Sequence, residues 1–193
     1  MGIPFKNNMK SIDILVDHLI RSGHIPEEDR DIYLYGFDIT FYTIWSTAVL
    51  LLIGLFCRQF PAAVIIVAGF YTFQTTGGGY HAKSHLKCFL TMIAGLLVGL
   101  SFIFLKGFPV LLWILLGIGA LLLFLVPLVL HPNKSYLETE RKRLTIRSVV
   151  LTLSLLVSVI VLNIFWNSFL YAFSVMFLLA GISRIAGKIA YDK

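Results

Sequence analysis

A short polar stretch, Gln74 to Cys88, interrupts a sequence that is otherwise mostly apolar. It reads Gln-Thr-Thr-Gly-Gly-Gly-Tyr-His-Ala-Lys-Ser-His-Leu-Lys-Cys. A cysteine thiolate is a nucleophile, and a nearby histidine can take the thiol proton and later return it to a leaving amine. These residue types indicate a cysteine peptidase with Cys88 as the nucleophile and His81 or His85 as the base.

The residues around the thiol fit the same chemistry. The three glycines at 77–79 allow backbone angles that are closed to other residues, so the chain can fold tightly and bring N–H donors near a substrate carbonyl. Lys83, Lys87 and the N-terminus of the helix that we predict to begin near Cys88 all supply positive charge, which favours the thiolate.

Spacing alone leaves the choice of histidine open. If residues 81–88 form one regular helix, His85 lies one turn from Cys88. His81 then lies two turns away, about 10 Å along the axis, which is too far for a direct bond. His81 can serve as the base only if the chain bends between it and Cys88, and the glycines precede His81.

Two other interpretations of these residues remain. His81, His85 and Cys88 are zinc-ligand types, and His131 or an acidic residue could complete the set, but the spacing is loose. A lone cysteine near the end of a membrane helix is also commonly inert. We expect neither a metal nor a cofactor.

The composition predicts that a lipid bilayer surrounds this stretch. The 193 residues are 58% hydrophobic and 13% charged, whereas soluble domains are about 45–50% apolar and about 25% charged. Pro61 and Pro109 mark the starts of two apolar segments, and Pro132 closes the second of these. Six segments have about the 17–25 residues that a membrane helix needs, and they are residues 39–57, 60–76, 89–105, 110–130, 147–165 and 168–186.

We therefore predict an all-α integral membrane protein that forms a single domain over residues 1–193. Residues 1–38 form a cytoplasmic or interfacial N-terminal part, and residues 39–186 form a six-helix bundle. The N-terminal part is predicted to begin with an amphipathic helix over 8–21, which ends at Gly23. Its apolar face consists of Ile12, Leu15, Val16 and Leu19.

The basic residues predict the orientation. With the N-terminus in the cytoplasm, all but two of the 16 basic residues fall on inner segments, the exceptions being Arg58 and Lys106. The net charge of +6 then reflects topology, and we expect no nucleic-acid partner. Both termini are cytoplasmic, and so are residues 77–88, in a reducing compartment where Cys88 stays a thiol.

Arg184, toward the inner end of the sixth span, can snorkel to the interface.

Two pairs of small residues predict close helix packing. Gly95 and Gly99 form a GxxxG motif in the third span, and Ser183 and Gly187 form a similar pair in the sixth. Small residues let helices approach closely, either within one chain or at a dimer seam.

The motif around the histidine and cysteine is similar to a known family. Gly78-Gly79-Tyr80-His81-Ala82, with Cys88 at the seventh position after the histidine, resembles the accessory gene regulator protein B family. The segment from Pro127 to His131-Pro132-Asn133-Lys134 resembles the segment after the fourth span in that family. The length, the six spans and the basic inner loops are similar as well.

The resemblance implies a peptidase of bacterial quorum sensing in the cell membrane, with its active site facing the cytoplasm. Such proteins cut the C-terminal part from a small AgrD-like precursor peptide and hold the remainder as a thioester. A side chain of the peptide then attacks the thioester to give a cyclic thiolactone or lactone. The resemblance implies Cys88 as the nucleophile, His81 as the general base and a homodimer. An arginine commonly precedes the glycines in this family, whereas Gln74 stands near that place here.

We predict supporting and substrate-binding residues around this pair. Gln74, Gly78, Gly79 and His85 would support the reactive loop. The basic residues predicted to attract an acidic peptide tail are Lys83, Lys87, Arg141, Lys142 and Arg143. A peptide transporter and a scaffold without catalysis are the alternatives. Charge inside spans commonly marks transport paths, and spans two to six are nearly free of it, which disfavours the transporter.

Overall fold

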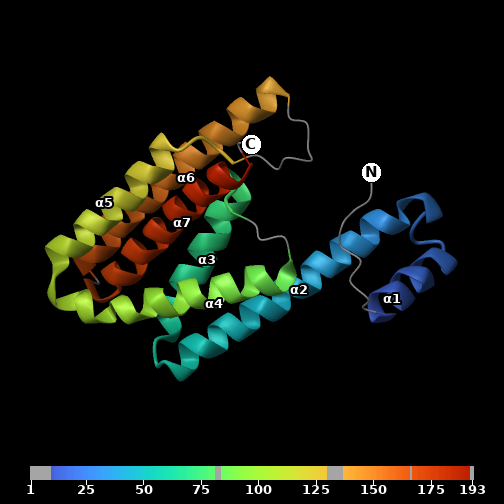
Figure 1. The fold of residues 1–193 in the computed structure, drawn as a ribbon, viewed down its shortest axis with the longest axis horizontal. Helices are drawn as coiled ribbons and strands as arrows, with labels where there is room; N and C mark the ends of the chain where they lie inside the picture. Colours follow the sequence, from blue (N-terminus) through green and yellow to red (C-terminus); the bar gives the residue numbers. More distant parts are fainter. Residues whose placement is uncertain (1–9, 81–83, 130–136, 166, 192–193) are drawn as a thin grey trace. The chain divides into compact units, whose positions relative to one another are not determined.

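The computed structural model describes residues 10–80, 84–129, 137–165 and 167–191, and all elements in this part of the chain are helical (Figure 1). The α-helices are α1 (Lys10–Arg21), α2 (Arg30–Phe56), α3 (Phe60–Gly77), α4 (His85–Ser101), α5 (Pro109–Leu125), α6 (Glu138–Phe165) and α7 (Leu170–Tyr191). The short 3-10 helices are η1 (Glu27–Asp29), η2 (Phe102–Gly107) and η3 (Asn167–Phe169). The chain divides into two compact units, Met1–Val49 and Leu50–Lys193.

The first unit turns back on itself after α1. The helix ends at Arg21, just before Gly23, as the sequence predicted, and Gly23 has a φ of 73°, in the left-handed region where glycine is favoured. Ile12, Val16 and Ile25 are buried. Leu15, which we predicted to share the apolar face of α1, is instead 37% exposed.

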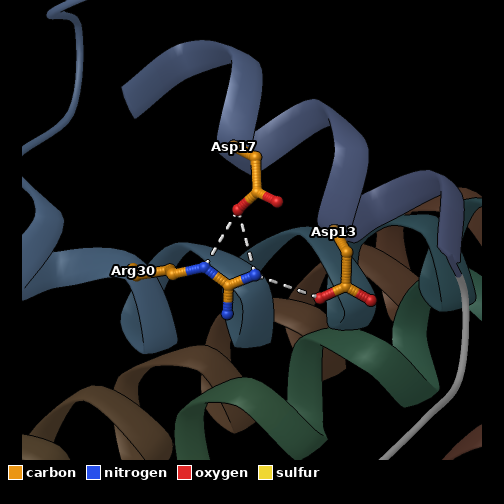
Figure 2. A network of polar contacts seen from close by, with 3 residues as sticks. All are labelled: Asp13, Asp17 and Arg30. Carbon is orange, nitrogen blue, oxygen red and sulfur yellow. Dashed lines mark hydrogen bonds and ion pairs between the residues drawn. The ribbon is translucent and has the colours of Figure 1, made fainter. Parts of the chain in front are cut away.

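Figure 2 shows the polar contact that ties α1 to the start of α2. Arg30 Nε and Nη2 each lie 3.0 Å from Asp17 Oδ1, and Nη2 lies 3.5 Å from Asp13 Oδ1. The two carboxylates are four residues apart on α1, so they lie on one face and a single guanidinium reaches both. All three side chains are partly exposed, so this network fixes the direction of the turn more than it stabilises the unit.

The second unit is built around α7. In the most apolar stretch of α7, 61% of the residues are buried, against 17–33% in α3, α4 and α6. α7 packs mainly on α5 and α3 and also contacts α4 and α6, and Figure 1 shows α5 running alongside it. The helices α3, α4, α5 and α6 are therefore all positioned by contacts with one central helix.

The contact between α5 and α7 is close because small residues line it. A Cβ on Gly119 would lie 2.5 Å from the backbone carbonyl carbon of Phe177. Ser174 is buried and donates a hydrogen bond to the backbone oxygen of Leu112 at 2.9 Å. Glycine at the contact lets the two backbones approach, and the hydroxyl links them directly.

The GxxxG pair of α4 faces α7 of the same chain. A Cβ on Gly99 would lie 2.7 Å from Val175 Cγ1, and a Cβ on Gly95 would lie 3.9 Å from Leu179. Of the two roles that the sequence left open, packing within one chain accounts for Gly99, whereas a Cβ on Gly95 would make only an ordinary contact.

Five helices in the described part of the chain are long and apolar enough to cross a membrane. These spans are Glu27–Phe56, Phe60–Gly77, His85–Gly107, Glu138–Ile164 and Leu170–Tyr191. α5 is apolar but has only 17 residues. The total of six spans therefore remains a prediction.

The predicted end of the fourth span, at residue 130, is wrong. α5 ends at Leu125, and Val126 is already extended, with φ −82° and ψ 120°. A residue before proline is disfavoured in the helical conformation, and Pro127 follows Val126. The predicted stop, Pro132, lies outside the described residues.

Substituting Gly119 tests the packing of α5 on α7. Gly119→Ala places a methyl group against the backbone of Phe177, which cannot move without separating the helices, so we expect a loss of about 1–3 kcal/mol of stability. Gly117→Ala is the matched control, because a Cβ there meets nothing within 4 Å. Thermal unfolding in detergent should show a lower midpoint for the first variant alone. Equal midpoints would contradict the close packing.

Candidate active site

Cys88 lies in the first turn of α4 and is half-buried. Ser84 caps this helix in an extended conformation, and its Oγ accepts a hydrogen bond from the backbone N–H of Lys87 at 3.3 Å. The N–H of Cys88 donates to the backbone oxygen of Ser84 at 3.0 Å. The prediction that Cys88 stands where this helix begins is confirmed, so its thiol belongs to the turn at the positive end of the helix dipole.

The extended Ser84 bears on the choice of histidine. Residues 81–88 do not form one regular helix, because Ser84 has φ −142° and ψ 149°. The separation of two helical turns therefore does not apply to His81 and Cys88. His85, half-buried, is the first residue of α4, one turn before the thiol. His81 and Lys83 lie outside the described residues, so the choice between the two histidines stays a prediction.

The glycine segment forms the end of α3 and the turn after it. Gly77 is the last helical residue, and Gly78 ends the helix with a φ of 66°. The backbone oxygen of Gly77 accepts a hydrogen bond from the N–H of Val129 at 3.1 Å. A Cβ on Gly78 would overlap the carbonyl oxygen of Val129. Both the backbone angle and the close approach therefore require glycine at position 78.

The turn then rests on α7. The N–H of Tyr80 donates to the backbone oxygen of Ser183 at 2.9 Å and lies 3.2 Å from its Oγ. Gln74 Nε2 donates to the same Oγ at 2.8 Å. Gly187, one turn further along α7, has no Cβ, and one placed there would lie 2.7 Å from the backbone carbon of Gly79. The pair Ser183 and Gly187 thus packs against a turn of its own chain.

Arg184 extends into the interior of the bundle. Its side chain is only 2% exposed, so the predicted snorkelling to the interface is wrong. Its Nη1 donates to the backbone oxygen of Leu123 at 2.6 Å, and its Nη2 donates to Ser148 Oγ at 2.9 Å. Leu123 lies in the last turn of α5, where carbonyl groups lack helical donors and the helix dipole is negative. The cation is held inside because other helices supply its acceptors.

Arg184 also meets the end of α3. A Cβ on Gly77 would overlap Nη2 of Arg184 and would lie 3.2 Å from Ser148 Oγ. Within the described residues, Nε of Arg184 and Oε1 of Gln74 are buried without a hydrogen-bond partner. The start of the glycine turn is thus packed directly on a buried guanidinium.

The basic residues predicted to bind a peptide tail are on the surface. Lys87 and the run Arg141 to Arg143 are exposed. Lys142 Nζ lies 3.6 Å from Glu138 Oε1, so part of the positive charge of the run is already offset. Among the described residues, no hydrogen bond or ion pair connects this run to Cys88, and its role in binding a peptide tail stays a prediction.

The described residues show no metal site and no disulfide at the site. Among them, no three His, Cys, Asp or Glu side chains gather closely enough to hold a metal ion. His81 and His131, two members of the alternative zinc set, lie outside this part of the chain. Cys57 and Cys88 are both free thiols.

Comparison with known proteins decides the family. The family model described as "Accessory gene regulator B" matches residues 12–183, which is most of the chain. The chain belongs to the accessory gene regulator B family. Membership supports a role in the accessory gene regulator system, whose members are associated with propeptide processing, and agrees with a multi-pass membrane protein. The chain matches no curated protein and no solved structure.

Sequence reasoning did not find the support that α7 and Ser84 give to the site. A serine before an apolar helical segment is a typical N-cap, so Ser84 could have been predicted. The small pair in α7 was visible, but nothing local showed that it packs against Gly79 and Tyr80. The burial of Arg184 depends on acceptors in two other helices and had no local signal.

Substituting Ser84 tests the start of α4. Ser84→Ala removes the side-chain acceptor for the N–H of Lys87, and loss of such a cap costs about 1 kcal/mol. Amide exchange at Lys87 and Cys88 should become about fivefold faster. Ser84→Asn, which keeps a capping oxygen, is the control and should retain protection. Equal exchange in the alanine variant would contradict the cap.

Proposed function

We propose that this protein is a membrane cysteine endopeptidase that cleaves the C-terminal part of a quorum-sensing precursor peptide and promotes cyclisation of the remainder. Its substrate is an AgrD-like peptide that lies on the inner leaflet. The protein works as a homodimer in the bacterial cell membrane, with the active site facing the cytoplasm.

The reaction proceeds by acyl transfer. Sγ of Cys88 attacks the scissile carbonyl carbon while His81 takes the thiol proton, and His81 then gives this proton to the departing amine. The C–N bond breaks, and a thioester remains on Cys88. A thiol or hydroxyl of the bound peptide attacks the thioester carbonyl, and its proton returns through His81 to the sulfur of Cys88. The products are a cyclic thiolactone or lactone and the free enzyme.

The family match over residues 12–183 is the observation that carries this proposal. Two structural features support it. Cys88 is half-buried in the first turn of α4. The extended Ser84 removes the regular helix that would hold His81 two turns away from the thiol.

A transporter is the second candidate, and Arg184 is the observation that favours it. A buried cation within membrane helices commonly marks a transport path. The contacts of Arg184 to Leu123 and Ser148 give it a structural role, so we rank transport below catalysis. Uptake of uncleaved peptide into liposomes that contain a Cys88→Ala variant would favour the transporter.

Substituting the thiol and the histidines tests the catalytic assignment. Cys88→Ala should abolish cleavage of the precursor peptide, because no nucleophile remains, whereas Cys57→Ala should cleave normally. His81→Gln should slow cleavage by about 10²–10⁴-fold, the usual contribution of a general base, and His85→Gln by much less. Single-turnover cleavage in liposomes, with insertion checked for each variant, measures this. Normal cleavage by Cys88→Ala would refute the mechanism, and the reverse order of the histidines would reassign the base.

Charge removal tests the proposed tail-binding run. Replacing Arg141 and Arg143 with Gln should raise KM for a precursor with an acidic tail and leave kcat unchanged, because the run attracts the tail and takes no part in the chemistry. The effect should shrink at high salt. A precursor with a neutral tail is the matched control. An equal rise in KM for both peptides would contradict the assignment.

A further inference from the structure

The proposed base and nucleophile belong to different segments, and both segments contact α7. α4, which begins with Cys88 in its first turn, packs on α7 through Gly99 against Val175. The turn that precedes His81 packs on α7 through Ser183 and Gly187. α7 therefore contacts both the helix that contains Cys88 and the turn that precedes His81.

The contact at the turn is specific in its hydrogen bonds. The N–H of Tyr80 points at both oxygens of Ser183, the carbonyl at 2.9 Å and Oγ at 3.2 Å. Gln74 Nε2 reaches the same Oγ at 2.8 Å, so this hydroxyl links the last helical turn of α3 to the residue after the glycines. Removing the hydroxyl would free Gln74 from α7 and leave the N–H of Tyr80 with its bond to the backbone oxygen of Ser183 alone.

Gly187 leaves room for the same turn because it has no Cβ. A Cβ there would lie 2.7 Å from the backbone carbon of Gly79 and 2.8 Å from the backbone nitrogen of Tyr80. Real Cβ atoms essentially never come this close to backbone, so the turn would have to move. Ser183 and Gly187 are four residues apart on α7 and present one face to the turn.

We propose that Ser183 and Gly187 are positioning residues for catalysis, which act by fixing the backbone of Gly79 and Tyr80. This inference rests on the proposed function, in which His81 is the base. His81 follows Tyr80 directly in the sequence, so the proposed base is covalently bonded to a residue that these contacts hold. A misplacement of about 1 Å at a reacting group can cost about 10²-fold in rate.

α7 itself offers matched controls for both residues. Ser174 is also buried, and its hydroxyl lies within hydrogen-bond distance of the backbone oxygens of Leu112 in α5 and Leu170 in α7 itself. Gly181 also lies in a tight contact, where a Cβ would be 2.9 Å from Leu122 Cβ. Substitution of either control disturbs packing in α7 without touching the turn.

The experiment compares Ser183→Ala with Ser174→Ala and Gly187→Ala with Gly181→Ala, in the full chain reconstituted in liposomes. We expect kcat for precursor cleavage to fall about 10–100-fold in the two turn variants, with KM nearly unchanged. The pH dependence of kcat should change in the turn variants, because the base is misplaced. Ser183→Thr, which keeps a hydroxyl, should recover most of the rate. The control variants should lose thermal stability to a similar degree but keep kcat and its pH profile.

The outcomes separate this inference from the proposed function. If Cys88→Ala abolishes cleavage and the turn variants behave like their controls, α7 has no positioning role and the inference is wrong. A rise in KM alone, or failure of Ser183→Thr to recover activity that Ser183→Ala loses, would also overturn it. If Cys88→Ala cleaves normally, the proposed function fails first. Should Gly187→Ala fail to insert, Ser183→Ala against Ser174→Ala still decides the question.

Discussion

The burial of one guanidinium constrains the whole second unit. An arginine enclosed by apolar helices is costly unless its N–H groups are met, because burial removes the water that would solvate it. For Arg184 the acceptors are a carbonyl at the end of α5 and a hydroxyl of α6. The guanidinium therefore holds the end of α5 and the part of α6 around Ser148 against α7 at the level of Gly77. The glycine turn, which leads to the predicted catalytic residues, begins at Gly77 beside this guanidinium.

Most of the helical layout could be predicted from local sequence. Pro61 and Pro109 lie at the starts of α3 and α5, and α3 runs to Gly77, one residue beyond the predicted span. Proline and glycine restrict or free the backbone next to them, so their effects on helix ends can be predicted from the sequence without knowledge of the fold. Pro127 could also have predicted the end of α5, but the prediction used Pro132 as the stop and made the helix too long. The existence of α1 was predicted, whereas the exposure of Leu15 was not.

The site was predicted less completely, for a physical reason. Residue types and spacing singled out Cys88 and two histidines, and their catalytic roles stay a prediction. The contacts that hold the segment, however, come from residues far away in the chain: Ser183 and Tyr80 are 103 residues apart. Contacts between residues so far apart in the chain produce no periodic pattern of residue types in either segment, so the sequence does not show them. Arg184 shows the same limit, because its environment is made by α3, α5 and α6.

The sequence separation of 103 between Tyr80 and Ser183 also determines when their contact can form during synthesis. A ribosome adds about 5–20 residues each second, so α3 and α4 emerge several seconds or more before their partner surface on α7 exists. Under the proposed function, the contacts that support the turn before His81 therefore form only after α7 has been made.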